Sequence, residues 1–170
     1  MEQSTHTTSH TTSTHTTSGD GAPDLARFTS AQEPVYGGVL AELRSGRKRT
    51  HWMWYIFPQI AGLGFSAASK HYALQDLEEA RAYLDHPVLG GRLRECAEAV
   101  LALEERSALE IFGSPDDVKF KSCMTLFAQV SEFAQVSEAD SVFLHVLEKY
   151  FGKEQDGQTL RLLAQREGNP

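Results

Sequence analysis

Apolar residues recur along most of the chain at the spacing of α-helices. The clearest stripe has gaps of four, three, four and three residues and consists of Leu89, Leu93, Cys96, Val100 and Leu103. Side chains at these gaps share one face of a helix, which can then pack against a core. Only the aromatic region around residues 51–57 also fits the alternation of a strand. We therefore predict an all-α fold.

Short polar motifs predict where the helices begin and end. Asp76–Glu79 and Ser107–Glu110 have the form of capping boxes, in which two side chains satisfy free backbone N–H groups. Pro34 suits the first turn of a helix that ends at Gly46. We predict a multihelical domain of about seven to eight helices. The other predicted boundaries are starts at Asp24, Ser66, Pro87, Ser114 and Asp140, and stops at Gly113 and Gly152.

The composition divides the chain into a tail and one domain. Residues 1–22 are rich in Ser, Thr and His and have few apolar side chains to bury, so we predict a disordered tail. Its histidines lack the companion ligands of a metal site. Residues 23–166 are long enough for one core, and we predict a single all-α domain there. Residues 167–170 are predicted to form a frayed C-terminus.

Residues 127–132 and 133–138 carry the same sequence, Phe-Ala-Gln-Val-Ser-Glu. In a helix, a step of six residues leaves the two copies about 240° apart around the axis. Both copies therefore cannot face one core, and we expect one of them to lie in a loop or a helix extension.

Residues 47–64 concentrate large side chains more than any other segment. They include both tryptophans, between a basic cluster and a Pro-Gln turn. Pro58 ends whichever element forms there, because it forces the preceding residue toward extended backbone. Gly62 and Gly64 indicate an irregular loop that allows a close backbone approach.

Charge and motifs argue against several classes of protein. The formal net charge is −7, so nucleic-acid binding, which needs a basic face, is not expected. The sequence shows no signal peptide and no apolar run of the ~20 residues that cross a bilayer, which predicts a cytoplasmic protein without a membrane segment. The scattered histidines and the two cysteines lack ligand spacing, and no motif indicates a metal or a cofactor.

The aromatic segment is also the best candidate for a functional site. Its tryptophans can form a platform for a flat ring and its arginines can meet a phosphate, which suits a nucleotide-like or ADP-ribose-like ligand. Gln59 stands in an apolar block and needs a partner. If catalysis occurs, His51 and Asp116 are the candidate acid or base. The candidate ligand-binding residues are Arg49, His51, Trp52, Trp54, Pro58, Gln59 and Lys119, with Lys121 as an outer contributor.

Each of these features also has a structural explanation. Aromatic side chains suit a core because each buries a large apolar area. The basic residues 47–49 follow a helix C-terminus, where cations meet the negative end of the helix dipole. Asp116 and Asp117 occupy the positive end of another helix and so oppose anion binding there. The alternative function is a helical protein-interaction module without catalytic activity. The sequence does not identify a partner or decide whether the protein is an enzyme.

Four motifs resemble the "domain of unknown function 1810" family. They are Arg47–Gly64, His86–Gly90, Ile111–Asp117 and Lys149–Gly152, and the resemblance covers about residues 24–165. It implies a small intracellular all-α domain and carries no catalytic residues with it. Some members are automatically labelled calpastatin, although this sequence shows none of the inhibitor repeats which that name implies. The tail and the duplicated hexapeptide depart from the family pattern.

Overall fold

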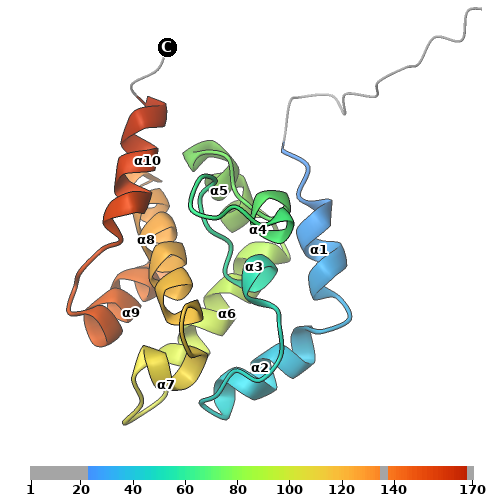
Figure 1. Cartoon of the computed structure of the whole chain (residues 1–170), viewed down its shortest axis with the longest axis vertical. Helices are drawn as coiled ribbons and strands as arrows, with labels where there is room; N and C mark the ends of the chain where they lie inside the picture. The colour runs from blue at the N-terminus through green and yellow to red at the C-terminus, as the bar shows by residue number, and fades with distance from the viewer. Residues whose placement is uncertain (1–22, 135–137, 168–170) are drawn as a thin grey trace, which may run out of the picture.

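The structure, a computed structural model, describes residues 23–134 and 138–167 and consists of helices joined by loops (Figure 1). In these residues the only strand-like pairing is an isolated bridge between Ile60 and Leu74, so the all-α prediction is confirmed. The predicted tail and residues 168–170 of the predicted frayed end lie outside the described residues. The helices are α1 (Ala26–Gln32), α2 (Tyr36–Arg44), α3 (Met53–Ile56), α4 (Ala67–His71), α5 (Leu77–Asp85), α6 (Leu89–Leu101), α7 (Ala108–Phe112), α8 (Asp116–Ala134), the 3-10 helix η1 (Glu138–Ser141), α9 (Val142–Phe151) and α10 (Gly157–Glu167).

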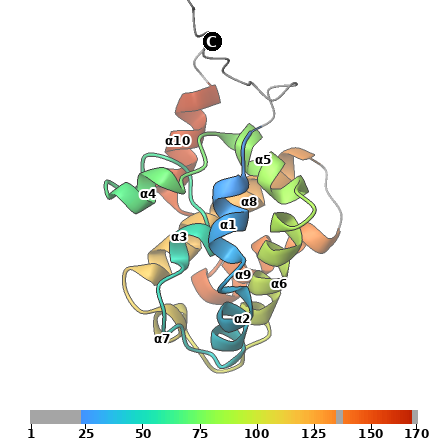
Figure 2. The same ribbon diagram turned by 90° about the vertical axis from the view of Figure 1, so that its right-hand side faces the viewer.

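The long helix α8 joins the two sides of the molecule. It contacts α5, α7, α9 and α10, while α6 contacts α2, α5 and α9. Figure 1 shows α9 and α10 on one side of α8 and the pair α1 and α2 on the far opposite side. Seen from the α1 side in Figure 2, α3 and α4 lie to one side of α1, and α5 and α6 lie to the other.

Aromatic side chains from distant segments form the centre of the core. Phe57, which follows α3, lies against Phe112 of α7 and Phe120 of α8, with ring centroids 6.0 and 4.9 Å away. Tyr83 of α5 meets Phe28 of α1 edge-on at 5.0 Å. All five are buried. Part of the aromatic segment is therefore core, because such rings remove much apolar area from water.

Helix boundaries follow the predicted motifs at most positions. The side chain of Asp76 accepts a backbone N–H hydrogen bond in the first turn of α5 at 2.8 Å, and Ser66 does the same for α4 at 3.1 Å. Ser107 forms the complete capping box that was predicted for α7. Gly46 and Gly152 end their helices with φ of +81° and +57°, a conformation that glycine adopts without strain.

Asp140 does not cap α9, and this prediction is wrong. The residue is 1% exposed, and its Oδ1 lies 2.5 Å from Nε of Arg94 on α6. The helix begins two residues later, after η1. A carboxylate so far removed from water needs a cationic partner, and sequence spacing did not reveal that α6 supplies one. Other starts also come later than predicted, at Tyr36 for α2, at Leu89 for α6 and at Asp116 for α8.

The duplicated hexapeptide diverges as its helical phase requires. Phe127 of the first copy lies in α8 and is fully buried, whereas Phe133 of the second copy, in the same helix, is 65% exposed. Residues 135–137 of the second copy lie outside the described residues. The two phenylalanines confirm that one core cannot accept both copies.

Two further findings concern membrane insertion and the two cysteines. None of the helices that the structure describes is both long and apolar enough to cross a membrane. Cys96 and Cys123 are free and buried, and burial raises the pKa of the Cys96 thiol to about 12. This thiol stays protonated near neutral pH and is a structural, unreactive side chain.

Candidate functional site

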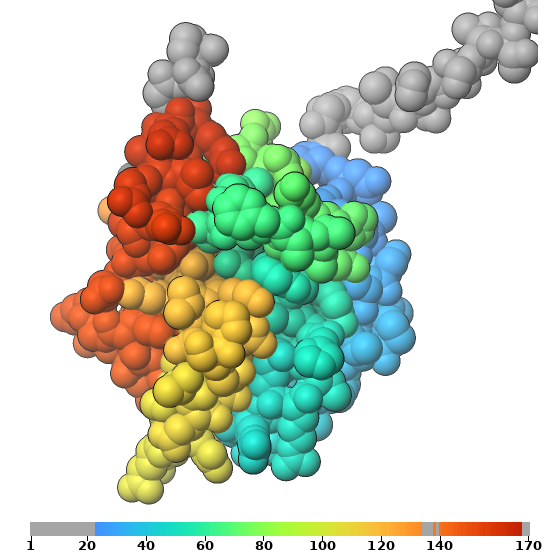
Figure 3. Space-filling view, viewed as in Figure 1, coloured from blue at the N-terminus to red at the C-terminus, as the bar shows by residue number. Residues whose placement is uncertain are grey.

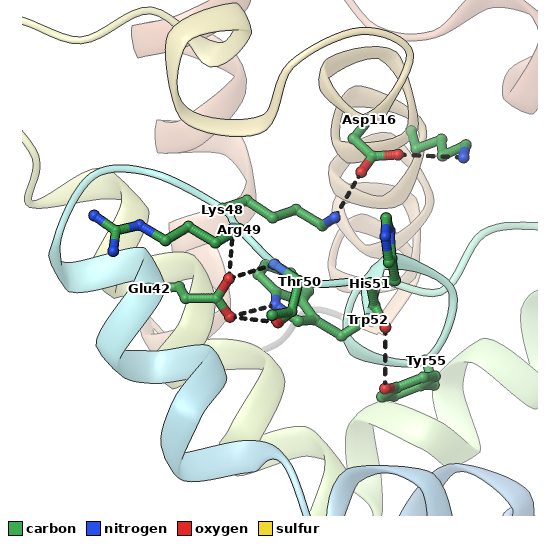
Figure 4. Close-up of polar contacts among 9 residues, drawn as sticks. Glu42, Lys48, Arg49, Thr50, His51, Trp52, Tyr55 and Asp116 are labelled. Atoms are coloured by element: carbon green, nitrogen blue, oxygen red, sulfur yellow. Dashed lines mark hydrogen bonds and ion pairs between the residues drawn. The ribbon is translucent and has the colours of Figure 1, made fainter.

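Glu42 of α2 fixes the beginning of the aromatic segment (Figure 4). Its carboxylate accepts hydrogen bonds from the backbone N–H groups of Arg49 and Thr50, from the Thr50 hydroxyl at 2.7 Å and from the indole N–H of Trp52 at 3.0 Å. Partial burial alone would raise the pKa of Glu42, but these hydrogen bonds outweigh it and lower the pKa. One carboxylate thus orders the connection between α2 and α3.

Lys48 and Asp116 join the same connection to the start of α8. Nζ of Lys48 lies 2.9 Å from Oδ2 of Asp116, and Nζ of Lys119 lies 3.2 Å from Oδ1. Burial would raise the pKa of Asp116, whereas its hydrogen bonds to the two lysines lower it, so the carboxylate stays ionised. These three side chains carry one positive charge in excess, and Lys119 is the more exposed cation, at 23% against 7% for Lys48.

The two tryptophans occupy different environments. Trp52 is 2% exposed, with its indole N–H bonded to Glu42. Trp54 is half-buried, and the ammonium group of Lys119 lies over its ring, 4.0 Å from the centroid. This distance is typical of a cation–π interaction. Trp52 therefore belongs to the core, while Trp54 presents part of its ring to the surface.

After Pro58, the chain forms an irregular segment instead of another helix. The carbonyl of Gln59 accepts a hydrogen bond from Leu74 N–H at 2.9 Å, and the N–H of Ala61 donates to the Leu74 carbonyl at 2.8 Å. Arg166 of α10 also donates to the carbonyl of Ala61, at 2.7 Å. The segment is thus held between the chain that follows α4 and the end of α10.

Two glycines shape the loop that follows. Gly62 has a φ of +104°, which other residues rarely adopt. A Cβ atom on Gly64 would lie 2.7 Å from the side chain of Ser69 and 3.7 Å from the ring of Trp54. The predicted close approach at this loop is confirmed, because the backbone of Gly64 takes the place that a side chain would fill.

Two cavities meet at this loop, and Trp54, Gln59, Leu63 and Gly64 line both of them. We name them by one distinguishing residue each. Each has a volume of about 230 Å³, which is smaller than the 300–1,000 Å³ typical of drug-sized ligand sites. The Tyr72 cavity is also lined by Ile60, Ala61, Gly62, Ser69, Lys70, Tyr72, Ala73 and Gln75, and the Lys119 cavity by Pro115, Val118, Lys119, Ser122, Asp156 and Gln158.

The cavities lie where three distant segments converge. The Tyr72 cavity is bounded by the α3–α4 loop and α4, and the Lys119 cavity also takes residues from the beginnings of α8 and α10. In Figure 3 these segments meet on the face toward the viewer, with α10 in red, α8 in orange and the α3–α4 region in green.

Gln59 is the polar group that the fold leaves unsatisfied at this point. The residue is 8% exposed, and its Nε2 atom is shielded from water without a hydrogen-bond partner. A buried donor without a partner destabilises a protein by about 1–3 kcal/mol. Arg27, Asp117, Asp140 and Arg166 also have one unpaired buried atom each, but they line neither cavity. Because Gln59 lines both cavities, its unsatisfied donor requires an explanation, and binding of a ligand is one.

The structure brings three of the seven predicted site residues together. Trp54 and Gln59 line both cavities, and Lys119 lines one of them. The other four line neither: Trp52 and Pro58 are buried, and Arg49 and His51 are exposed. Figure 4 shows the side chain of Arg49 directed away from Asp116.

The site also contains residues that the sequence did not indicate. Asp156 lines the Lys119 cavity, and its Oδ2 accepts hydrogen bonds from Ser122 at 3.1 Å and from the Thr159 hydroxyl at 2.5 Å. An Asp at a helix start is recognisable as a cap, but its distance in sequence from Trp54 conceals their proximity. Lys121, the predicted outer contributor, pairs with Glu154 at 2.5 Å instead.

The arrangement is better suited to binding than to catalysis. Of the two candidate acid–base groups, His51 lines neither cavity, and Asp116 is held ionised by two lysines. Within residues 23–134 and 138–167, no three His, Cys, Asp or Glu side chains are grouped so as to hold a metal ion. What remains is an aromatic ring, an unpaired amide, a partly buried cation and the carboxylate of Asp156.

These features define an all-α domain with a small, partly polar cleft beside a Pro-Gln turn. Residues 22–163 match the family described as "Protein of unknown function (DUF1810)", and the chain belongs to that family. Its structure is similar to that of the conserved hypothetical protein Rv1873 from Mycobacterium tuberculosis, with a TM-score of 0.78 and 50% sequence identity. The comparison covers 83% of this chain and 96% of that one. No curated protein matches the sequence.

Proposed function

We propose that this protein binds a small, ring-containing ligand of the nucleotide class at the wall shared by the Tyr72 and Lys119 cavities. The observation that carries the proposal is the buried, unpaired Nε2 of Gln59. Trp54 offers a ring surface beside it, and Lys119 offers a cation for an anionic group. The predicted cytoplasmic location stays a prediction.

The size of the cavities limits the ligand. Each of them alone is too small for a drug-sized molecule, but they share four lining residues. A ring in one cavity and an anionic group in the other would use both. The larger ADP-ribose-like ligands require the α3–α4 loop to move, which the glycines of that loop permit.

The test combines nucleotide binding with a stability measurement on Gln59→Met. Methionine keeps the approximate size of glutamine and removes the unpaired donor. We expect the variant to be more stable than the natural protein by about 1 kcal/mol, because a buried unsatisfied group is lost. Nucleotides at about 100 times their dissociation constant should stabilise the natural protein by about 2.7 kcal/mol in a thermal-shift assay, and this shift should disappear in the variant.

Gln75→Met is the matched control, because Gln75 lines the Tyr72 cavity but is exposed. It should leave unliganded stability within about 0.5 kcal/mol of the natural value. The proposal fails if no nucleotide, including ADP-ribose, shifts the melting temperature. It also fails if Gln59→Met destabilises the unliganded protein as an ordinary structural residue would.

The alternative, a helical interaction module, has one observation in its favour. Phe65, in the loop between the two helices that flank the site, is 88% exposed. It lines a third, more open cavity of about 340 Å³ with Arg161 and Leu162 of α10. A large exposed aromatic side chain is typical of an interface. Phe65→Ser separates the two functions, since it should leave nucleotide binding unchanged if the ligand site is formed by Trp54 and Gln59.

A further inference from the structure

We infer that Phe65 and the neighbouring face of α10 form a docking surface for an acidic peptide segment of another protein, one that carries an apolar side chain between Asp or Glu residues. Phe65 and Arg161 line neither the Tyr72 cavity nor the Lys119 cavity, so the inference goes beyond the proposed ligand site and is tested separately from it. We call this surface the Phe65 surface, and it consists of Leu63, Phe65, Gln158, Arg161, Leu162 and Gln165.

The apolar part of the Phe65 surface is a ring beside a hollow. A single exposed apolar side chain is common on proteins and needs no partner. Phe65 differs because it borders the open cavity of about 340 Å³, whose wall includes the half-buried residues Leu63 and Leu162. The lining residues of α10 span positions 158–165 at helical spacing, so the cavity follows one face of this helix for about two turns. An apolar side chain of a partner can therefore enter between Phe65 and Leu162.

The fold holds the backbone in place on both sides of Phe65. The hydroxyl oxygen of Ser66 accepts a hydrogen bond from the N–H of Ser69 at 3.1 Å, and the Ser69 hydroxyl donates to the Ser66 carbonyl at 2.8 Å. On the other side, Gly64 packs so closely that a Cβ there would lie 2.7 Å from the Ser69 side chain. Because the backbone is fixed beforehand, less conformational entropy is lost when a partner binds, which favours affinity.

The charges at this surface are positive, although the chain has a formal net charge of −7. Arg161 lines the cavity beside Phe65, and Lys70 lines the adjoining Tyr72 cavity. Both cations are exposed, and neither forms an ion pair with another residue that the structure describes. Within residues 23–134 and 138–167, no Asp or Glu lines either cavity, and the one carboxylate of α10, Glu167, is at its C-terminal end. An acidic segment therefore complements this surface in charge.

A second copy of the chain and a membrane fit these observations less well. Two copies that met through the Phe65 surface would bring both Arg161 side chains to one interface, because a two-fold contact uses the same patch on each subunit. An anionic membrane would be repelled by the net charge of −7. It would also leave the cavity beside Phe65 unfilled, whereas a peptide side chain can enter it.

The experiment selects peptides from a random library displayed on phage, with the full natural chain as the bait. We expect the enriched sequences to share an aromatic or aliphatic residue flanked by Asp or Glu. Measured by fluorescence polarisation, the enriched peptide should bind Phe65→Ser at least about tenfold more weakly, the effect of an anchor residue. Phe133→Ser is the matched control, because it removes a ring that is 65% exposed on α8, and it should leave the affinity unchanged.

Charge reversal tests the acidic character of the partner. Arg161→Glu should weaken the peptide about fivefold and make its binding less sensitive to salt. The same peptide with lysines in place of its acids should bind Arg161→Glu better than it binds the natural protein. Arg47→Glu makes an identical change at another exposed arginine and should have no effect. Phe65 and Arg161 are exposed, so an unchanged melting temperature will show that both variants fold.

Several results would overturn the inference. They are the absence of any enriched peptide, enrichment of peptides without acidic residues, and equal binding by Phe65→Ser and the natural protein. A dimer in light scattering that Phe65→Ser dissociates would assign the surface to a second copy instead. Binding to phosphatidylserine vesicles that depends on Phe65, without peptide binding, would assign it to a membrane.

Discussion

Trp52 and Trp54 are two residues apart, yet their surroundings differ. Trp52 belongs to the core and has a hydrogen-bond partner for its indole N–H, whereas Trp54 borders a cleft with an unpaired polar group. The indole N–H of Trp52 donates a hydrogen bond to Glu42, and the residue is 2% exposed. Around Trp54, the ring is half-buried, and the neighbouring Gln59 lacks a partner for Nε2. A group that the fold satisfies needs no further explanation, whereas an unsatisfied one at a cavity points to a ligand. Within this short segment, the presence or absence of hydrogen-bond partners therefore distinguishes the structural residue Trp52 from the candidate functional residue Gln59.

Alanine substitution of each tryptophan should give the largest difference in stability between the two environments. Trp52→Ala should lower the free energy of unfolding by about 3–5 kcal/mol, because it leaves a core cavity. Trp54→Ala should cost only about 1 kcal/mol, since its ring is partly in water already. Urea denaturation followed by circular dichroism measures both. Equal losses would show that the two side chains contribute alike, and the contrast would not hold.

Glu42→Gln tests the hydrogen bonds that Glu42 accepts from Trp52 and its neighbours. The substitution keeps the shape of the side chain and removes the charge, so it should lower stability by about 2 kcal/mol. The folded-state pKa of Glu42 is lowered, so its contribution is present above the unfolded pKa and is lost as pH falls through the folded value. The difference between variant and natural protein should therefore shrink in acid. A difference that stays constant down to about pH 2 would contradict this assignment, since the unfolded pKa is about 4.3.

Gly64→Ala tests the packing of the loop that borders the cleft beside Trp54. The new methyl group would meet the Ser69 side chain at 2.7 Å, so the loop must shift, at a cost of about 1 kcal/mol. Gly91→Ala in α6, where nothing lies within 4 Å of a new Cβ, should instead stabilise the protein by about 0.5–1 kcal/mol. Thermal unfolding measures both changes. Stabilisation by Gly64→Ala would show that the loop has room which the structure does not indicate.

The sequence by itself determined the helical fold and most of its boundaries. The stripe from Leu89 to Val100 is buried in α6, and Asp76 and Ser107 cap the helices they were predicted to cap. These features are local, because helical phase and capping depend on residues within one or two turns. The likeness of residues 47–64 to a known family was local in the same sense. For the same reason, the phase argument separated Phe127 from Phe133.

Only the tertiary structure decided which polar groups are satisfied and which residues meet. Arg94 forms an ion pair with Asp140, and Glu42 accepts a hydrogen bond from Trp52, although neither pairing follows from helical spacing. The candidate site joins Trp54 and Gln59 to Lys119 on α8 and to Asp156 just before α10, about 60 and 100 residues further along the chain. Packing decides such contacts, because the partner of a buried group is fixed by which helices touch. The sequence indicated that the Gln59 side chain needs a hydrogen-bond partner, and in the fold its Nε2 atom has none.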